Sequence, residues 1–166
     1  MLTAHEIFGF MSPALAKSII EFVHENDREL YRLTLTAVAE AKKVRLLFLE
    51  RKAKPERHAD MIGMLSKQRL DAIAANLIRG WLLKKNRSML VDFLNALQVA
   101  HNEGAVDDLP AEMDDARLNA AIDQLLKNYP AEEVAVYLNA FYAMNEVNWP
   151  NLKNLLENDS RLQLGA

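Results

Sequence analysis

Glu21 and His24 are the first residues in the chain whose types and spacing could do chemistry. On a helix, a Glu-x-x-His pair places a carboxylate and an imidazole on one face, as the metal centres of di-iron bundles require. Such a centre needs a second pair and two further glutamates, and none of the other histidines (His5, His58 and His101) has an acidic residue three positions before it. The pair therefore indicates a solvated helix face or an ordinary hydrogen bond within the helix, and we predict no metal site here.

The acidic stretch from residue 103 to residue 115 is the other candidate for a bound cation. It lacks the alternating acids, the glycine and the terminal glutamate of a calcium-binding loop. Asp114 or Asp115 is better explained as the cap of a following helix. The stretch therefore predicts a loop that binds no metal.

The local motifs of common enzymes are missing as well. The sequence has no cysteine, no glycine-rich phosphate loop, no Gly-x-Ser-x-Gly elbow and no His-Glu-x-x-His pattern. We therefore predict no catalytic residue and no cofactor. An enzyme whose pocket collects Glu21, His24 and His101 from distant helices stays open as an alternative, because such a site leaves no local motif.

Charge is distributed unevenly along the chain. Residues 42 to 87 carry 13 basic and 4 acidic side chains, a net +9, whereas residues 88 to 166 carry 4 basic and 13 acidic ones, a net −9. The basic segment predicts a surface for an anion or an acidic partner. Its candidate residues are Lys42, Lys43, Arg45, Arg51, Lys52, Lys54, Arg57, Lys84, Lys85 and Arg87.

Three interpretations of this basic surface stay open. It can be solvated, it can pair with the acidic segment within the fold or across a subunit boundary, or it can neutralise the phosphates of a nucleic acid or another polyanion. Nucleic-acid binding is the less favoured interpretation, because Phe48 and Trp81 fall on expected core stripes and leave no aromatic side chain on which bases could stack.

The elements that must position these residues are expected to be helices. The chain has only 5 Gly and 5 Pro, the prolines separate segments with apolar residues at helical spacing, and no alternating pattern indicates a strand. Ser12 and Pro13 predict one helix start and Asp27 the next. From Asp27 we expect an unbroken helix of about seven turns toward Pro55. Its expected buried stripe is Leu30, Leu33, Ala37, Ala41, Val44 and Phe48.

An internal similarity marks the second half of the chain. Residues 71–100 align without a gap with residues 115–144, and seven of the paired positions are identical. Each copy is expected to be a helix, a tight turn and a second helix, and neither can cover its own apolar stripe unless the two stack. The sequence therefore predicts a single all-α domain, a helical bundle or short helical-repeat array with a duplicated helical hairpin in its C-terminal half.

Asn95 and Asn139 occupy matched positions within the two copies. Asparagine is unfavourable in the middle of a helix, so its recurrence suggests a role. We expect the two side chains to bond neighbouring backbone groups between the stacked repeats, or else to line a shared groove.

These patterns together predict a cytoplasmic helical module without catalytic activity. It is expected to bind a protein partner or a second copy of itself, for instance as a homodimer. The alternative is binding of nucleic acid or another polyanion through residues 42 to 87. No window approaches the roughly 18 apolar residues of a membrane span, and the first residues lack the features of a signal peptide, so no membrane partner is expected.

Overall fold

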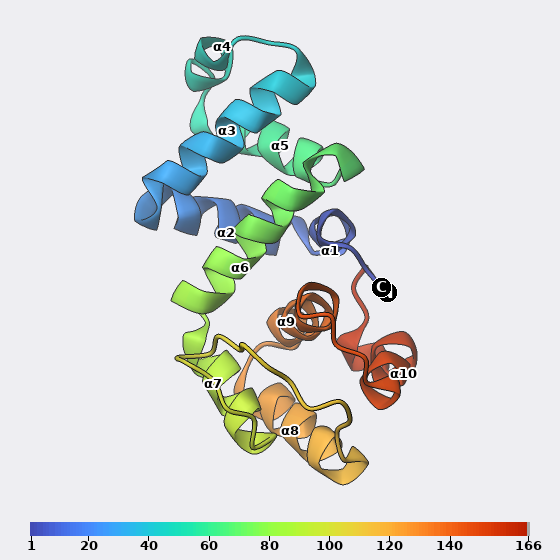
Figure 1. Cartoon of the computed structure of the whole chain (residues 1–166). Coiled ribbons are helices and arrows are strands. Elements are labelled where there is room, and N and C mark those ends of the chain that lie inside the picture. Colours follow the sequence, from blue (N-terminus) through green and yellow to red (C-terminus); the bar gives the residue numbers. More distant parts are fainter. Residues whose placement is uncertain (166) are drawn as a thin grey trace. The chain divides into compact units, whose positions relative to one another are not determined.

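The computed structural model describes residues 1–165, and within them it contains ten α-helices, two 3₁₀ helices and no strand (Figure 1). The all-α class predicted from the sequence is therefore confirmed. The contacts divide the chain into two compact units. The N-terminal unit is Thr3–Trp81, and the C-terminal unit is Met1–Leu2 together with the described chain from Leu82 onward. That both units form one domain stays a prediction.

The N-terminal unit is built around three helices that pack against one another, α2, α3 and α5. Its helices in chain order are α1 (Ala4–Phe10), α2 (Pro13–Asn26), α3 (Arg28–Lys42), α4 (Leu46–Glu50), α5 (Lys54–Leu65), the 3₁₀ helix η1 (Gln68–Leu70) and α6 (Asp71–Lys84). The core between the three packed helices contains Ile19, Val38 and Met61, each 0% exposed. The boundary of the unit falls inside α6, after Trp81.

The predicted starts of α2 and α3 are confirmed, and each depends on a side-chain cap. The Leu15 amide donates to Ser12 Oγ at 3.2 Å, with Pro13 at the first helical position. The Leu30 amide donates to Asp27 Oδ1 at 3.1 Å. Both caps satisfy amides that have no partner within the helix, so the sequence signal and its physical cause are local.

The predicted long helix toward Pro55 is wrong. α3 ends at Lys42 because Lys43 adopts the left-handed conformation, with φ 57°. The Val44 amide then donates to the Ala39 carbonyl at 3.0 Å, a common way of closing a helix. Glycine is the usual residue at such a position and none is present here, so the sequence did not indicate the break.

The predicted buried stripe of α3 is wrong as well. Leu33 and Phe48 are 52% and 53% exposed. The buried residues of α3 lie on the adjacent stripe: Tyr31, Thr34, Leu35, Val38 and Ala39. Two apolar stripes overlap on this helix, and packing against α2 and α5 buries the one with the larger side chains.

The C-terminal unit holds the remaining helices, α7 (Arg87–Ala96), α8 (Asp115–Asn128), α9 (Ala131–Met144), α10 (Pro150–Asn158) and the 3₁₀ helix η2 (Ser160–Leu162). An aromatic cluster forms its centre. Phe93 of α7 lies edge-on to Tyr137 and Phe141 of α9, with ring centroids 5.5 and 5.6 Å apart, and Phe141 lies 5.8 Å from Trp149. Such contacts add to the gain from burying the rings.

The acidic stretch is a loop up to Asp114, as predicted, and Asp114 caps α8 by accepting from the Arg117 amide at 2.9 Å. Two side chains hold the loop against the start of α10. Trp149 Nε1 donates to the Pro110 carbonyl at 2.8 Å, and Asn151 Nδ2 donates to the Met113 carbonyl at 2.7 Å. The loop is therefore a fixed part of the unit.

The helix starts agree with the internal similarity. α6 and α8 begin at the aligned residues Asp71 and Asp115, and α7 and α9 begin at the aligned residues Arg87 and Ala131. The boundary between the units lies inside the first copy, and the duplication itself stays a prediction. None of the helices among residues 1–165 combines the length and the apolar character that crossing a bilayer requires.

Candidate functional site

The ten basic candidates do not form one continuous free surface. Lys42 and Lys52 both contact Asp60, with Nζ to carboxylate distances of 3.2 and 2.6 Å, and these two hydrogen bonds hold the pKa of Asp60 below its usual value despite partial burial. The two lysines therefore help to join the C-terminal ends of α3 and α4 to the middle of α5, and much of their charge is neutralised within the unit.

Three further candidates belong to the C-terminal unit. Lys84, Lys85 and Arg87 are exposed around the turn between α6 and α7, and Arg87 Nη1 lies 3.4 Å from Glu103. An exposed pair of this kind contributes about 0 to 1 kcal/mol. It nevertheless places one of the basic candidates against the acidic segment, as one of the three interpretations of the charge pattern expects.

The short helix α4 presents apolar side chains to solvent between basic ones. We call this surface the basic tip; it comprises Arg45, Leu47, Phe48, Arg51 and Lys52, which line one shallow hollow. Leu47 and Phe48 are 52% and 53% exposed. The next residue, Leu49, is fully buried and anchors α4 to the unit. The Lys52 ammonium lies 5.0 Å from the centroid of the Phe48 ring. α4 follows the C-terminal end of α3 and lies at the outer end of the N-terminal unit (Figure 1).

The exposure of Phe48 corrects the sequence interpretation. The sequence predicts Phe48 in the core and therefore no aromatic platform for nucleic acid. Trp81, in contrast, is 0% exposed as expected. The basic segment therefore carries one accessible aromatic ring beside Arg45 and Arg51. Its exposure could not be predicted from the sequence, because Phe48 stands at helical spacing from the residues of α3.

Arg57 and Lys54 lie at a second place, where α2, α3 and α5 meet. Arg57 Nε donates to Tyr31 Oη at 2.8 Å, and Tyr31 Oη lies 3.0 Å from His58 Nε2. An arginine can only donate, so the Tyr31 oxygen accepts from Arg57 and shares a further hydrogen bond with His58 Nε2. The His24 ring stacks on Tyr31 with a centroid distance of 4.2 Å.

The histidines of this cluster are held neutral. Burial, followed by the positive charges of Arg57 and Lys54, lowers the pKa of His58 from 6.5 to about 4. Burial and the charges of Lys54, Arg57 and Arg28 also lower the pKa of His24. Burial raises the pKa of Tyr31, although Arg57 opposes this effect. The protonated tyrosine therefore lies beside a neutral imidazole.

An open cleft of about 670 Å³ runs beside the cluster, and we call it the cationic cleft. Arg28 and Arg32 of α3 line it together with Lys54 and Arg57 of α5. Among the described residues, none of these four side chains has a carboxylate within 4.0 Å. Sequence reasoning missed Arg28 and Arg32, because the segment before residue 42 has a net negative charge; their spacing of four residues was the available signal.

Glu21, His24 and His101 do not form the pocket considered from the sequence. His24 lines the cationic cleft, but Glu21 is not among the residues lining it and instead lies 3.8 Å from Lys17. His101 belongs to the C-terminal unit. Its Nε2 contacts Asn95 Oδ1 at 2.8 Å and its Nδ1 accepts from the Gly104 amide at 3.1 Å, so it is a satisfied histidine near a helix end.

The C-terminal unit has a groove of opposite charge. It lies between the acidic loop and the end of α9, has a volume of about 440 Å³, and we call it the acidic groove. The exposed carboxylates of Asp107, Asp108 and Glu146 line it. Half-buried apolar side chains, among them Leu109 and Met144, form part of its wall, and no basic residue belongs to the lining.

Asn95 and Asn139 have different surroundings although they are aligned. Asn95 is exposed and accepts from His101. Asn139 is 6% exposed, and its Nδ2 donates to the carbonyls of Ala135 at 2.8 Å and Leu162 at 3.1 Å. The bond of Asn95 goes to His101 in the segment that follows α7, and the bonds of Asn139 lie within α9 and between α9 and η2. A role of either side chain between the repeats stays a prediction.

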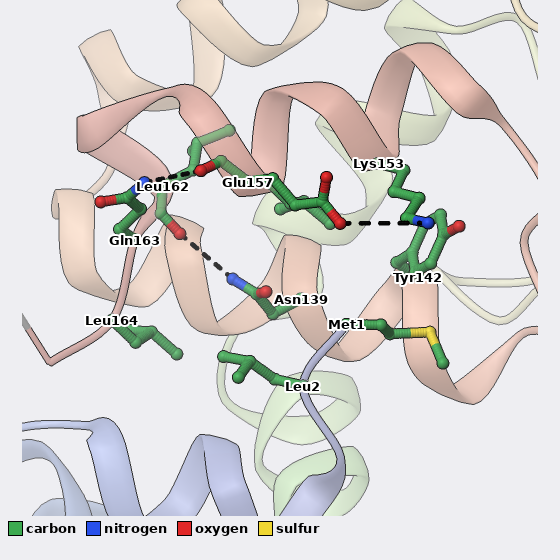
Figure 2. Close-up of a pocket in the computed structure, with 10 residues that line it drawn as sticks. Met1, Leu2, Asn139, Tyr142, Lys153, Glu157, Leu162, Gln163 and Leu164 are labelled. Carbon is green, nitrogen blue, oxygen red and sulfur yellow. Dashed lines mark hydrogen bonds and ion pairs between the residues drawn. The ribbon is translucent and has the colours of Figure 1, made fainter.

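Asn139 also lines a small pocket of the C-terminal unit, shown in Figure 2. Apolar side chains such as Leu2 and Leu164 form the walls, and the Lys153–Glu157 ion pair, at 4.0 Å, lies beside it. The volume is about 240 Å³. Pockets for small molecules usually measure about 300 to 1,000 Å³, so this pocket is a weaker candidate than the cleft.

No protein-family model matches the chain, and comparison with curated proteins and with solved structures gives no significant match. The candidate functional sites are therefore the three charged surfaces of the protein: the basic tip, the cationic cleft and the acidic groove.

Proposed function

We propose that the protein is a non-catalytic interaction module that binds a protein surface through the basic tip, and that a second copy of the chain is such a partner. The observation that carries the proposal is the exposure of Leu47 and Phe48, each more than half accessible, between Arg45 and Arg51. Apolar side chains flanked by arginine are characteristic of the central residues of protein interfaces. A cytoplasmic location is part of this proposal.

The acidic groove supplies the matching chemistry in the partner copy. The tip presents the cations of Arg45 and Arg51 beside two apolar side chains, since Lys52 is paired with Asp60, and the groove has three carboxylates above an apolar wall. Opposite charges of this kind set the orientation of two surfaces and speed their encounter. Because tip and groove are different surfaces of one chain, their contact is head-to-tail and gives rings or longer assemblies, or a closed pair when both contacts form at once.

The first test is the mass of the full chain by light scattering or sedimentation at low and high salt. The Debye length falls from about 10 Å at 0.1 M to about 3 Å at 1 M salt, so we expect association at low salt that weakens as salt is added. A monomer at every salt and protein concentration would remove self-association.

A charge-swap experiment tests the two surfaces directly. One variant carries Arg45→Glu and Arg51→Glu in the tip, and the other carries Asp107→Lys and Asp108→Lys in the groove. All four side chains are exposed, so both variants are expected to fold. Each variant alone brings like charges together and is expected to be monomeric, whereas their equimolar mixture restores opposite charges and is expected to associate. Variants that associate as well as the wild type would contradict this contact.

Binding of nucleic acid or another polyanion through residues 42 to 87 is the second candidate, and the exposed Phe48 ring favours it. A base could stack on this ring while Arg45 and Arg51 contact phosphates. Leu47 is an argument for the protein interface, since an aliphatic side chain offers no stacking face. Fluorescence anisotropy with a single-stranded oligonucleotide separates the two: binding that Phe48→Ala weakens, and that Asp107→Lys with Asp108→Lys does not, supports the nucleic acid.

A further inference from the structure

The cationic cleft carries more positive charge than the protein neutralises. Arg28, Arg32, Lys54 and Arg57 line it, and Glu25 and Glu50 are its only acidic lining residues. Four cations against two carboxylates leave a formal charge of +2 with neutral histidines. Cations gathered without paired carboxylates repel one another, and a bound anion removes that cost.

The hydrogen bonds of Arg57 also leave donors available for an anion. Arg57 gives its Nε–H to Tyr31 and an Nη1–H to the Glu50 carbonyl, at 2.8 and 3.3 Å. These two bonds hold the guanidinium at the cleft wall and leave its other N–H groups for a ligand, since a guanidinium has five donors. Arginine is fitted to oxyanions because its donors form a planar fork.

Two further features of the wall concern its polar groups. α5 begins at Lys54 without a side-chain cap, and Glu56, the acidic residue of its first turn, is not among the residues lining the cleft. His24 lines the cleft, and its buried Nδ1 has no hydrogen-bond partner within the described part of the chain. Buried polar groups are seldom left unsatisfied in native proteins.

We propose that the cationic cleft binds a phosphate monoester dianion, held by Arg28, Arg32, Lys54 and Arg57. A phosphate monoester carries a charge of about −1.5 to −2 at neutral pH, which matches the formal charge of the cleft. Its three terminal oxygens accept from arginine forks on α3 and from the ammonium at the start of α5. The part of the lining formed by Tyr31 and Leu35 then faces the organic group of the ester. The site lies apart from the residues of the basic tip and does not depend on self-association.

The test is an NMR titration of the full chain with three probes: inorganic phosphate, phenyl phosphate and citrate. We expect both phosphates to shift the signals of His24, Arg28 and Arg32, with phenyl phosphate binding more tightly because its ring contacts the apolar wall. Equal affinity of the two phosphates would show that the cleft takes free phosphate and would overturn the monoester assignment. Tighter binding of citrate would overturn the choice of phosphate.

A pair of matched variants shows whether the cleft itself is responsible. Arg28→Gln with Arg32→Gln removes two exposed cations from the cleft, and Arg69→Gln with Arg79→Gln removes two exposed cations from elsewhere on the same unit. We expect the first variant to weaken phenyl phosphate binding about tenfold or more, as loss of charge-assisted hydrogen bonds does, and the second to change it less than twofold. Equal weakening in both variants, or shifts outside the cleft only, would overturn the proposal.

Discussion

The neutral state of His58 makes the stability of the N-terminal unit depend on pH. His58 is 2% exposed, and its Nε2 is hydrogen-bonded to Tyr31 Oη, 3.0 Å away. A proton on the imidazole would place a positive charge in this buried position beside Arg57 and Lys54. The folded protein therefore resists protonation of His58 down to a pKa of about 4, against an ordinary value of 6.5.

The sign and size of the effect follow from proton linkage. Between pH 6.5 and about 4 the unfolded chain protonates this ring and the folded chain does not, so the stability from neutral His58 is complete above pH 6.5 and is lost as the pH falls toward 4. The difference between the pKa of His58 in the unfolded and the folded chain corresponds to at most about 3 kcal/mol in the free energy of unfolding. The lowered pKa of His24 acts in the same direction.

Urea unfolding of the wild type and of His58→Gln at pH 7.5, 6.5, 5.5 and 4.5 measures this contribution. Glutamine can still form a hydrogen bond with Tyr31 but does not titrate, so the wild type is expected to lose about 2 to 3 kcal/mol more than the variant between pH 7.5 and 4.5. Parallel curves for the two proteins, or a His58 NMR signal that titrates near pH 6.5, would refute the reasoning. The lowered carboxylate pKa of Asp60 falls below this window, because its ordinary value is 3.8.

Three further outcomes are expected from single substitutions. Leu49→Ala should lower the free energy of unfolding by about 2 to 5 kcal/mol, because Leu49 is 0% exposed. Phe48→Ser should change it by less than about 0.5 kcal/mol. Equal costs of the two substitutions would place Phe48 in the core. Asn139→Ala should cost about 1 to 3 kcal/mol through the lost bond to the Leu162 carbonyl, and Asn95→Ala less than about 0.5 kcal/mol, both measured by urea unfolding. Asp60→Asn should cost about 1 kcal/mol at low salt and less in 1 M salt; a cost independent of salt would argue against the ion pairs.

Local signals predicted where helices begin. Ser12 and Asp114 accept backbone amides at 3.2 and 2.9 Å, and Pro150 stands at the start of α10. Capping needs only residues within one turn, so the sequence is sufficient. The end of α3 at Lys42 was not predictable in the same way, because a lysine in the left-handed conformation carries no sequence signal.

The candidate sites were predicted less well, for a different reason. The cationic cleft takes residues from α2, α3 and α5 and from Glu50 of α4, and only their packing brings Arg28 close to Lys54. Which of two overlapping stripes on α3 is buried also depends on that packing, and the stripe decides whether Leu33 points to solvent. Periodicity predicts that a helix has a buried face, and the neighbouring helices select which one.

Counting basic residues in the sequence overestimates the charge available to a polyanion. A single strand bound by all ten candidates would give a slope of about −7 in log K against log salt concentration. In the structure Lys42 and Lys52 share Asp60, Arg57 bonds Tyr31, and Arg87 lies near Glu103. Lys54 lines the cationic cleft, and Lys84 and Lys85 belong to the other unit. A strand on the basic tip therefore meets Arg45 and Arg51 with Lys43 nearby, and the expected slope is about −2. A measured slope near −7 would mean that the internal ion pairs open on binding, and the basic segment would then act as one surface after all.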